Sequence, residues 1–430
     1  MTEMVAVVGQ GYVGLPMALR IAEAGQAVIG FDVNRSLVDA LNEGRSHIDD
    51  VSDSELQTAL RGSFRASADP EDLARATVIL VCVPTPLSQD GGPDLAPVRA
   101  AAETIGRHVS SGTLCILEST TYPGTTEEVF APLVCGSRLT VGRDVFIAFS
   151  PERIDPGNTA YGVQNTPKVV GGLTPECGRR AKAFYSSFVD TVVEARGAKE
   201  AEMAKLLENT FRHVNIALVN EMLRFSRDLD IDLWDAIDCA ATKPFGFMAF
   251  RPGPGVGGHC IPVDPSYLSH RVKAKLGYAF RMVELAEEIN TAAPQYVADR
   301  ARDLLNEVGK PVKGSKILLL GVTYKANISD RRESPADPLA RRLLGWGADL
   351  AYHDPFVERW SPNEEHGADN PVDLPTLTCV PDLEAAVQDA DVVILLQSHS
   401  SYDLARLSDV ASSLLDTRGV VPETSAVHRL

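Results

Sequence analysis

The N-terminal segment places the strongest constraint on the fold. An apolar run at 4–8 leads into glycines at 9, 11 and 14, and a second apolar run at 27–31 ends on Asp32. A GxGxxG spacing is common by chance. Here it lies between an apparent strand and a helical pattern, with an acid after the next strand, which is typical of a dinucleotide-binding βαβ unit. The sequence therefore predicts that a parallel α/β sheet begins at residue 4.

The residues of this turn have separate predicted tasks. Gly9 allows the tight turn, Gly11 lets a pyrophosphate approach the backbone, and Gly14 lets the helix pack on the strand. Tyr12 and Val13 lie at the helix N-terminus, which receives the phosphate charge. We expect all five residues to contact the cofactor.

Asp32 indicates which dinucleotide is bound. Its carboxylate is expected to accept hydrogen bonds from the adenosine ribose and to repel a 2′-phosphate, which favours NAD over NADP. Arg35 leaves an alternative open, because an arginine there can accept a 2′-phosphate or lie along the adenine. We expect NAD, with both residues at its adenosine end.

Polar side chains follow three further strands. The apolar runs with strand length lie at 77–83, 113–120 and 145–150. Thr85, Thr120 and Glu152 stand at or just after their ends. Strand ends of an open α/β sheet face the ligand crevice, so these side chains are expected to face cofactor or substrate. A plain turn threonine is the alternative for Thr85.

Residues 198–229 read as one long amphipathic helix without glycine or proline. Lys205, Asn209 and Arg212 share one face at i, i+4 and i+7. A solvated stripe is one interpretation. Burying polar groups in an apolar helix costs free energy unless they have hydrogen-bond partners or a function, and this favours a functional interpretation of the face. The helix also offers a natural dimer seam.

The segment 251–265, RPGPGVGGHCIPVDP, must be a loop because its glycines and prolines exclude a helix or an interior strand. Such a loop lets backbone approach a ligand closely, and we expect Arg251 and Gly257 to contact it. A lone thiol, Cys260, lies near its end, four residues before Asp264. This position favours chemistry, although a small buried residue is the alternative.

The third part of the chain repeats the plan of the first, with a strand at 316–320, a glycine turn and a basic loop. Lys325, Arg331 and Arg332 in this loop suggest an anionic ligand such as a nucleotide diphosphate, although loop charges are often only solvated. The predicted fold class is α/β, with two Rossmann-like doubly wound domains joined by a long central helix and a helical middle domain. The predicted domains are 1–197, 198–300 and 301–430.

Charge and cysteine usage limit the partners. A net charge of −17 and a pI near 5.0 argue against nucleic acid or an anionic membrane surface. No apolar run approaches the ~18 residues of a membrane span. The seven cysteines form no CxxC pair and no zinc-site spacing, so we expect no metal and a reducing, cytoplasmic location.

Several motifs together resemble the nucleotide-sugar 6-dehydrogenases, relatives of UDP-glucose and GDP-mannose dehydrogenase. The motifs that carry the resemblance are GQGYVGLP, VCVPTP, ESTTYPGTT, SPERIDPG, KLLEN, GPGVGGHCIPVDP and GVTYKANISDRRESP. They span essentially the whole chain in order. The resemblance implies an NAD-dependent, four-electron oxidation of a sugar primary alcohol to a uronic acid, on a homodimer built around the long helix.

The resemblance also implies residue roles. Cys260 matches the nucleophile, which would capture the aldehyde as a thiohemiacetal and leave from a thioester. The other expected catalytic residues are Lys205, Asn209, Asp264, Glu152 and Thr120. Thr85 and Thr120 match threonines on the nicotinamide side. The expected substrate contacts are Glu152, Arg153, Lys205, Asn209, Arg212, Arg251, Gly257, Lys325 and Arg332.

One departure from the pattern bears on the substrate. Pro156 stands where the UDP-glucose enzymes carry a second glutamate. With TTYPG and PKVVGG, this is similar to the branch acting on UDP-N-acetylhexosamines, with UDP-N-acetylglucosamine expected ahead of the mannosamine and galactosamine epimers or UDP-glucose. The sequence also leaves open a two-electron dehydrogenase of the hydroxyacid kind and a non-catalytic nucleotide-sugar-binding protein.

Overall fold

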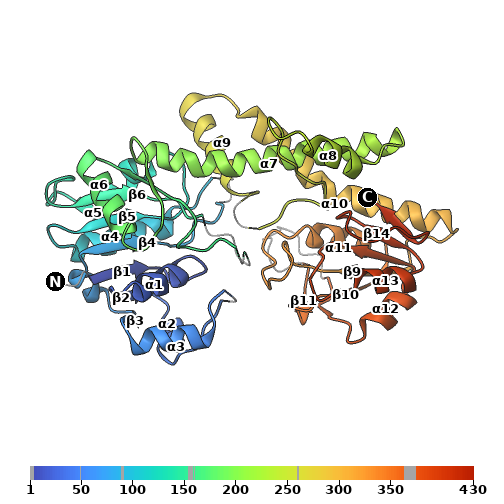
Figure 1. Cartoon of the computed structure of the whole chain (residues 1–430), viewed down its shortest axis with the longest axis horizontal. Coiled ribbons are helices and arrows are strands. Elements are labelled where there is room, and N and C mark those ends of the chain that lie inside the picture. Colours follow the sequence, from blue (N-terminus) through green and yellow to red (C-terminus); the bar gives the residue numbers. More distant parts are fainter. Residues whose placement is uncertain are drawn as a thin grey trace. The chain divides into compact units, whose positions relative to one another are not determined.

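The computed structural model describes residues 4–48, 50–88, 92–153, 158, 160–258, 261–362 and 374–430. The chain forms two compact units (Figure 1). The N-terminal unit comprises Met1–Glu208 and Ser266–Tyr278, and the C-terminal unit comprises Asn209–Pro265 and Ala279–Leu430.

The N-terminal unit is built on one eight-stranded sheet of order β3-β2-β1-β4-β5-β6-β7-β8. Its strands are β1 (Met4–Val8), β2 (Ala27–Phe31), β3 (Phe64–Ser67), β4 (Val78–Val81), β5 (Leu114–Leu117), β6 (Phe146–Phe149), β7 (Lys168–Gly172) and β8 (Val192–Glu194). Strands β1 to β6 are mutually parallel. Strand β7 runs antiparallel to β6, and β8 is parallel to β7. The last two strands therefore run against the rest of the sheet.

Helices cover both faces of this sheet. They are α1 (Gly14–Glu23), α2 (Arg35–Asn42), α3 (Asp53–Arg61), α4 (Ala96–His108), α5 (Ala131–Cys135) and α6 (Pro175–Tyr185), with the short turns η1 (Pro70–Arg75) and η2 (Thr126–Phe130). Val5 and Val7 of β1 pack in one core with α1 and α6. Ala6 and Val8 pack in another with α4 and α5. Because side chains alternate along a strand, an all-apolar β1 is buried on both faces, as in a doubly wound sheet.

The long helix α7 (Ala198–Asp228) has 31 residues, which confirms the helix predicted at 198–229. Its first turns belong to the N-terminal unit. There the buried carboxylate of Glu202 accepts hydrogen bonds from Gly124 N at 2.6 Å, Thr126 N at 2.9 Å and Thr126 Oγ1 at 2.7 Å. These bonds compensate the burial of the charge and attach the PGTT turn to α7.

The C-terminal unit contains a five-stranded parallel sheet of order β10-β9-β13-β14-β15. Its strands are β9 (Lys316–Leu320), β10 (Asp349–His353), β13 (Val392–Leu395), β14 (Leu414–Asp416) and β15 (Val427–Arg429), and β11 (Arg359–Trp360) pairs with β12 (Leu377–Thr378) separately. Its helices are α8 (Leu233–Ala241), α10 (Arg281–Glu307), α11 (Ala336–Gly345), α12 (Leu383–Asp389) and α13 (Leu404–Val410). Helix α9 (Asp264–Leu276) begins in this unit and continues in the N-terminal one.

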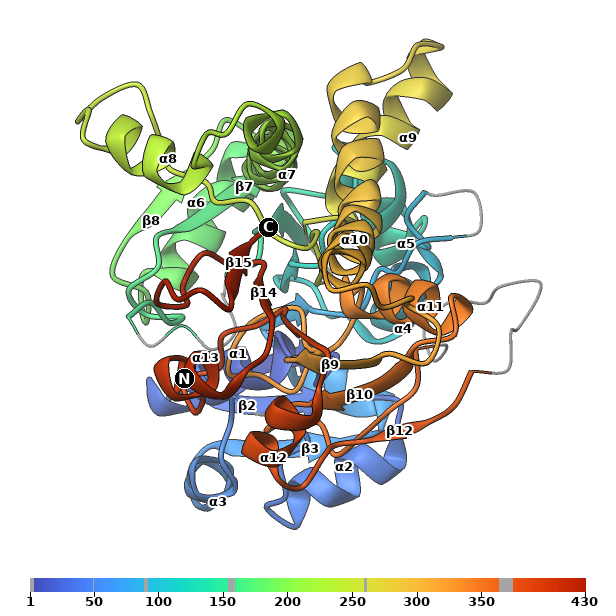
Figure 2. The same cartoon turned by 90° about the vertical axis from the view of Figure 1, so that its right-hand side faces the viewer.

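This second sheet is also covered on both faces. Leu319 packs with α10 and α11, whereas Leu318 and Leu320 pack with α12 and α13. Figure 2 shows α12 and α13 on the side of the sheet away from α10 and α11. The predicted fold class, two doubly wound α/β units and a long central helix, is confirmed. Among the described residues, no helix has both the length and the apolar character needed to span a membrane.

Candidate active site

The turn between β1 and α1 contains three glycines, two of which the packing of the protein requires and one of which it does not. Gly9 has a φ of +90°, and a Cβ there would lie 2.7 Å from the Cys82 carbonyl oxygen. A Cβ on Gly14 would lie 1.8 Å from the Gly9 carbonyl oxygen. A Cβ on Gly11 would meet no protein atom within 4 Å. The fold thus requires Gly9 and Gly14, whereas the open space at Gly11 fits the close approach of a pyrophosphate.

The adenosine end of this turn is held by backbone donors. Asp32 Oδ2 accepts from Gln10 N at 2.9 Å, and Oδ1 accepts from Asn34 N at 2.9 Å. A carboxylate has about four acceptor positions, so two bonds leave capacity for a ribose diol. Tyr12 and Val13 are half-buried just before α1, and Arg35 is exposed at the first residue of α2. All of these residues remain predicted cofactor contacts.

The structure brings together the two threonines at neighbouring strand ends. Thr85, after β4, donates from Oγ1 to the carbonyl oxygen of Thr120, after β5, at 2.9 Å. The buried Tyr267 hydroxyl donates to the Thr85 carbonyl. The parallel strands explain this proximity. Tyr267 lies on α9 and was not predicted, because nothing local in the sequence connects it to β4.

Glu152 and Lys205 also meet. Lys205 Nζ donates to the Glu152 carbonyl oxygen at 2.6 Å, and both residues are 8% exposed. The neighbouring Arg153 gives its backbone N–H to Glu152 Oε1 at 2.6 Å. Its guanidinium pairs with Glu208 and donates to the Pro167 carbonyl at 2.9 Å. Arg153 therefore makes structural contacts on the ligand side of the sheet.

A buried cluster beside Glu152 was not predicted. Lys168 Nζ lies 2.9 Å from Glu118 Oε2 and 3.6 Å from Glu152 Oε2. The Tyr185 hydroxyl donates to Glu118. Burial raises the pKa of Glu118, against the pull of Lys168. Burial would lower the pKa of Lys168, but its two carboxylate neighbours outweigh this effect and raise it. The motifs PKVVGG and ESTTYPGTT contained Lys168 and Glu118, but no spacing connected them.

In the C-terminal unit, Asn209 is paired with Asp264. Asn209 Nδ2 donates to Asp264 Oδ2 at 2.6 Å, and both residues are buried. This bond supplies the partner that a polar group in an apolar helix was expected to need. Asn209 and Lys205 are one turn apart on α7, and Arg212 on the same face is exposed. Cys260 and His259 lie outside the described residues.

The glycine loop 251–258 lies against the loop 322–334. Gly258 N donates to the Arg332 carbonyl at 2.9 Å. A Cβ on Gly257 would lie 2.6 Å from the Glu333 carbonyl oxygen and 2.7 Å from Tyr324 Cβ. Packing between the loops thus explains Gly257 without a ligand. Arg251 is exposed.

The basic loop is neutralised in part by its own acid. The Arg332 guanidinium makes a bidentate contact with Asp330, at 3.0 Å from Nε and 2.6 Å from Nη2. Lys325 is half-buried, and its carbonyl accepts from Thr323 Oγ1 at 2.8 Å. Lys325 and Arg332 both remain predicted contacts of the substrate.

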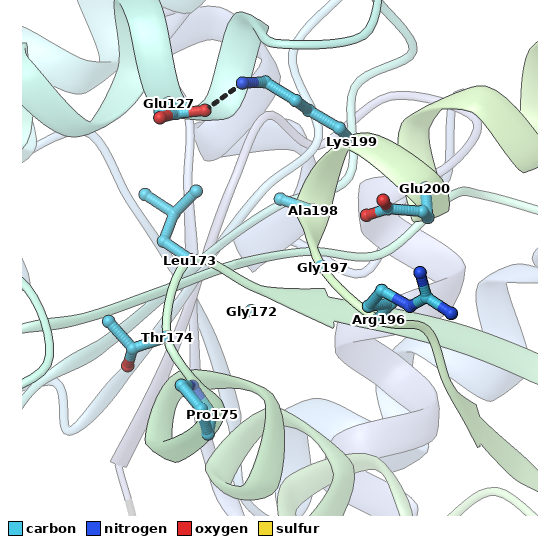
Figure 3. A pocket seen from close by; sticks show the side chains of 10 residues that line it. All are labelled: Glu127, Gly172, Leu173, Thr174, Pro175, Arg196, Gly197, Ala198, Lys199 and Glu200. Atoms are coloured by element: carbon cyan, nitrogen blue, oxygen red, sulfur yellow. Dashed lines mark ion pairs between the residues drawn. The ribbon is translucent and has the colours of Figure 1, made fainter.

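A small pocket in the N-terminal unit has a lining of its own (Figure 3). It is found where α6 and α7 begin, between Thr174, Arg196 and Lys199, and an ion pair of 2.5 Å joins Lys199 to Glu127 at its rim. None of the described residues that line it is a predicted site residue. Within the described part of the chain, no cluster of three or more His, Cys, Asp or Glu could hold a metal ion.

Known solved structures resemble the whole chain. A UDP-D-ManNAc dehydrogenase from Pyrococcus horikoshii has a TM-score of 0.88 at 30% identity, covering 99% of this chain and 98% of that one. The UDP-N-acetyl-mannosamine dehydrogenase Cap5O from Staphylococcus aureus has 0.83 at 31%, covering 99% and 97%. A 3-hydroxyisobutyrate dehydrogenase from Mycobacterium tuberculosis shares the fold over 70% of this chain, at 18% identity and a TM-score of 0.51.

Sequence comparisons agree. UDP-N-acetyl-D-mannosamine dehydrogenase of Salmonella typhi is 35% identical over 432 residues, covering 97% of this chain and 98% of the relative. UDP-N-acetyl-D-glucosamine 6-dehydrogenase of Pseudomonas aeruginosa is 34% identical over 434 residues, covering 99% of both. Residues 3–189, 199–292 and 318–428 match the NAD binding, central and UDP binding domains of one family. The cofactor is NAD, as predicted, and the chain belongs to the UDP-glucose/GDP-mannose dehydrogenase family of NAD-dependent nucleotide-sugar dehydrogenases.

Proposed function

We propose that this protein oxidises the 6-hydroxymethyl group of a UDP-N-acetylhexosamine to the carboxylate, with two NAD consumed per sugar. UDP-N-acetylglucosamine is the first substrate to test. UDP-N-acetylmannosamine is the alternative, because relatives named for the two epimers are 34% and 35% identical to this chain. Pro156, in place of a second glutamate, supports the N-acetylhexosamine class.

The buried hydrogen bond between Asn209 and Asp264 is the observation that carries the proposal. It connects α7 to Asp264, four positions after Cys260 in the sequence. It therefore holds the end of the loop 251–265 beside the polar face of the helix. A chain that only bound nucleotide sugars would have no evident use for a buried amide and carboxylate paired in this way, four residues along the sequence from a cysteine.

The chemistry requires one thiol to serve two oxidations. Bound NAD, which the Gly11 turn and Asp32 would hold, would supply the hydride acceptor for the alcohol and, in a second round, for the adduct that follows. The Cys260 thiolate adds to the aldehyde carbon to give a thiohemiacetal, and loss of hydride from that carbon gives a thioester. Water then attacks the thioester, the carbon–sulfur bond breaks, and carboxylate and thiol are released. The covalent step also keeps the reactive aldehyde on the protein.

Lys205 and Asn209 have donors left for the developing oxyanion. An ammonium has three N–H donors, and one of those of Lys205 goes to the Glu152 carbonyl. An amide has two, and one of those of Asn209 goes to Asp264. The remaining N–H groups are proposed to stabilise negative charge on the substrate oxygen, and loss of one such donor costs about 10²–10³ in kcat.

Glu152 is the proposed base for the hydrolytic water. It follows β6 at the ligand edge of the sheet and is fixed at both its carboxylate and its carbonyl, by Arg153 N and Lys205 Nζ. A carboxylate at this place can take a proton from the attacking water as a general base. Thr85 and Thr120, joined by their hydrogen bond, are proposed to flank the nicotinamide.

We further propose a homodimer in which two copies of α7 pack together. Met203, Leu207, Phe211, Leu218 and Phe225 are 41–64% exposed and recur at intervals of four and seven residues, so they form one apolar stripe. Leu207→Arg should convert a dimer into a monomer in sedimentation, with Met17→Leu, inside the N-terminal core, as a conservative control.

The experiment that tests the function is NADH release with a panel of UDP-N-acetylglucosamine, its mannosamine and galactosamine epimers, and UDP-glucose. The highest kcat/KM should belong to an N-acetylhexosamine. Cys260→Ala, which can still form the first NADH but no thiohemiacetal, is the matched control with greatly reduced steady turnover. A clear preference for UDP-glucose would contradict the substrate class. Equal activity in the Cys260→Ala control would return the hydroxyacid-type alternative to first place.

A further inference from the structure

The reversal of strand β7 delivers a basic residue to the ligand edge of the sheet. Strands β1 to β6 all end at this edge. Because β7 runs antiparallel to β6, it begins at the same edge, and its first residue is Lys168. The register pairs Ala148 with Gly172 and Phe149 with Gly171, so continuing it brings Lys168 opposite Glu152.

The side chains follow this backbone geometry. Lys168 is 4% exposed, and its ammonium lies 2.9 Å from Glu118 and 3.6 Å from Glu152. Tyr185 is fully buried, its hydroxyl donates to Glu118, and its ring centroid lies 5.2 Å from the ammonium. Lys168 is thus fixed from three sides.

A fold-stabilising ion pair explains only part of this arrangement. Glu118 alone would neutralise Lys168, and buried ion pairs contribute little net stability. The additional carboxylate of Glu152, 3.6 Å from the ammonium, is not needed to neutralise Lys168, so a structural ion pair does not explain its place. We therefore propose that Lys168 is a positioning residue, whose ammonium orients the Glu152 carboxylate for attack of water on the thioester. This inference rests on the proposed function, in which Glu152 is the base.

The other groups that face Glu152 set the charge balance. The Cys82 thiol is buried beside both carboxylates, which raises its pKa and keeps it neutral. Burial and Glu118 likewise raise the pKa of Tyr185. Lys205 contacts the Glu152 carbonyl, and Arg153 contacts its carboxylate through the backbone N–H, because its guanidinium pairs with Glu208. Lys168 thus supplies an ammonium that is paired directly with the Glu152 carboxylate.

The test isolates the hydrolytic step. The enzyme completes one turnover with limiting UDP-N-acetylhexosamine, and intact-protein mass spectrometry follows the decay of the covalent sugar adduct between pH 5 and 9. In Lys168→Met the acidic limb of the pH profile of the decay rate should move to higher pH, because the ammonium that lies 3.6 Å from the Glu152 carboxylate is lost. Lys168→Arg, which keeps the charge, should restore most of the wild-type profile.

Glu118→Gln keeps the Lys168 ammonium and removes the acid that competes with Glu152 for it. The acidic limb of its decay rate should therefore lie at the same pH as in the wild type or at lower pH. Lys168→Met alone could fail to fold because Glu118 would lose its partner. The double variant Lys168→Met/Glu118→Gln avoids that unpaired acid. The acidic limb of its decay rate should lie at higher pH than that of Glu118→Gln. The inference would be overturned if Lys168→Met folds and the acidic limb of its decay rate stays at the wild-type pH. It would also be overturned if the acidic limb of Glu118→Gln moves to higher pH. A purely structural role would lower the rate at every pH instead.

Glu152→Gln separates this inference from the proposed function. If the adduct of Glu152→Gln decays as fast as in the wild type, Glu152 is not the base, and both the role of Glu152 and this inference fail. If Glu152→Gln stalls at the adduct while the Lys168 variants keep the wild-type profile, only the role of Lys168 fails. The proposed oxidation itself is tested independently by the two NADH released before hydrolysis.

Discussion

Two alanine substitutions in the glycine turn should have opposite consequences. At Gly14 the new Cβ would lie 1.8 Å from the Gly9 carbonyl oxygen, so backbone must move. Overpacking of this kind costs about 3 kcal/mol, which corresponds to a fall in Tm of roughly 6–12 °C for a unit of this size. At Gly11 the new Cβ meets no protein atom within 4 Å, so the change in stability should stay within about 0.5 kcal/mol.

Cofactor binding should reverse the order of the two variants. A methyl group at position 11 would push the pyrophosphate away and weaken one charge-assisted hydrogen bond, worth about 1.5–3 kcal/mol. The Kd for NAD should therefore rise about 10- to 100-fold. Scanning fluorimetry without NAD and calorimetric titration with NAD measure the two quantities. Gly11→Ala with wild-type NAD affinity would refute the position of the pyrophosphate, and Gly14→Ala with wild-type Tm would refute the packing argument.

Three further results are expected. The wild type should prefer NAD over NADP in kcat/KM, because Asp32 opposes a 2′-phosphate; equal use of NADP would contradict this. Lys325→Ala should raise the KM for the sugar nucleotide and leave the affinity for NAD little changed; the reverse would mean that the two ligands are assigned to the wrong domains. Burial lowers the pKa of His213 to about 4 from 6.5, so the unfolded chain binds that proton more readily and stability falls as pH drops from 6.5 towards 4. Tm should therefore fall less between pH 7 and pH 5 in His213→Leu than in the wild type, and equal falls would show that His213 does not contribute.

The glycine turn and the residues at the ends of the parallel strands could be predicted from the sequence. The turn at Gly9, Gly11 and Gly14 follows from spacing between a strand and a helix, which are both local properties. The contact between Thr85 and Thr120 follows from topology, because consecutive parallel strands end at one edge. The same rule correctly placed Glu152 at that edge, after β6.

The direction of β7 was not predictable by these rules. Its five residues, KVVGG, are compatible with either direction, and the choice depends on packing against β6 and α6. The partners of Lys168 are therefore 50 and 16 residues away along the chain, at Glu118 and Glu152, with no periodicity to connect them. Buried polar networks of this kind are specified by tertiary contacts, which a single sequence does not display.

For Gly257 and Arg332, the residue type alone did not show which neighbours the side chain or backbone would meet. Gly257 was predicted to allow a ligand close to the backbone, but the structure gives it a packing reason through Glu333 and Tyr324. Arg332 stays a predicted substrate contact, and the structure adds that its guanidinium makes a bidentate pair with Asp330. In both cases the loop 322–334 supplies the neighbour, and only the fold brings it near.

The number of NADH molecules formed per sugar tests the central claim most directly. In the wild type, limiting UDP-N-acetylhexosamine should yield two NADH per sugar and a uronate, with no free aldehyde. Cys260→Ala should lose at least ~10³ in steady turnover, because covalent catalysis disappears with the step that it divides. One NADH per sugar in the wild type, or uronate formed by Cys260→Ala at a comparable rate, would contradict the thiohemiacetal mechanism.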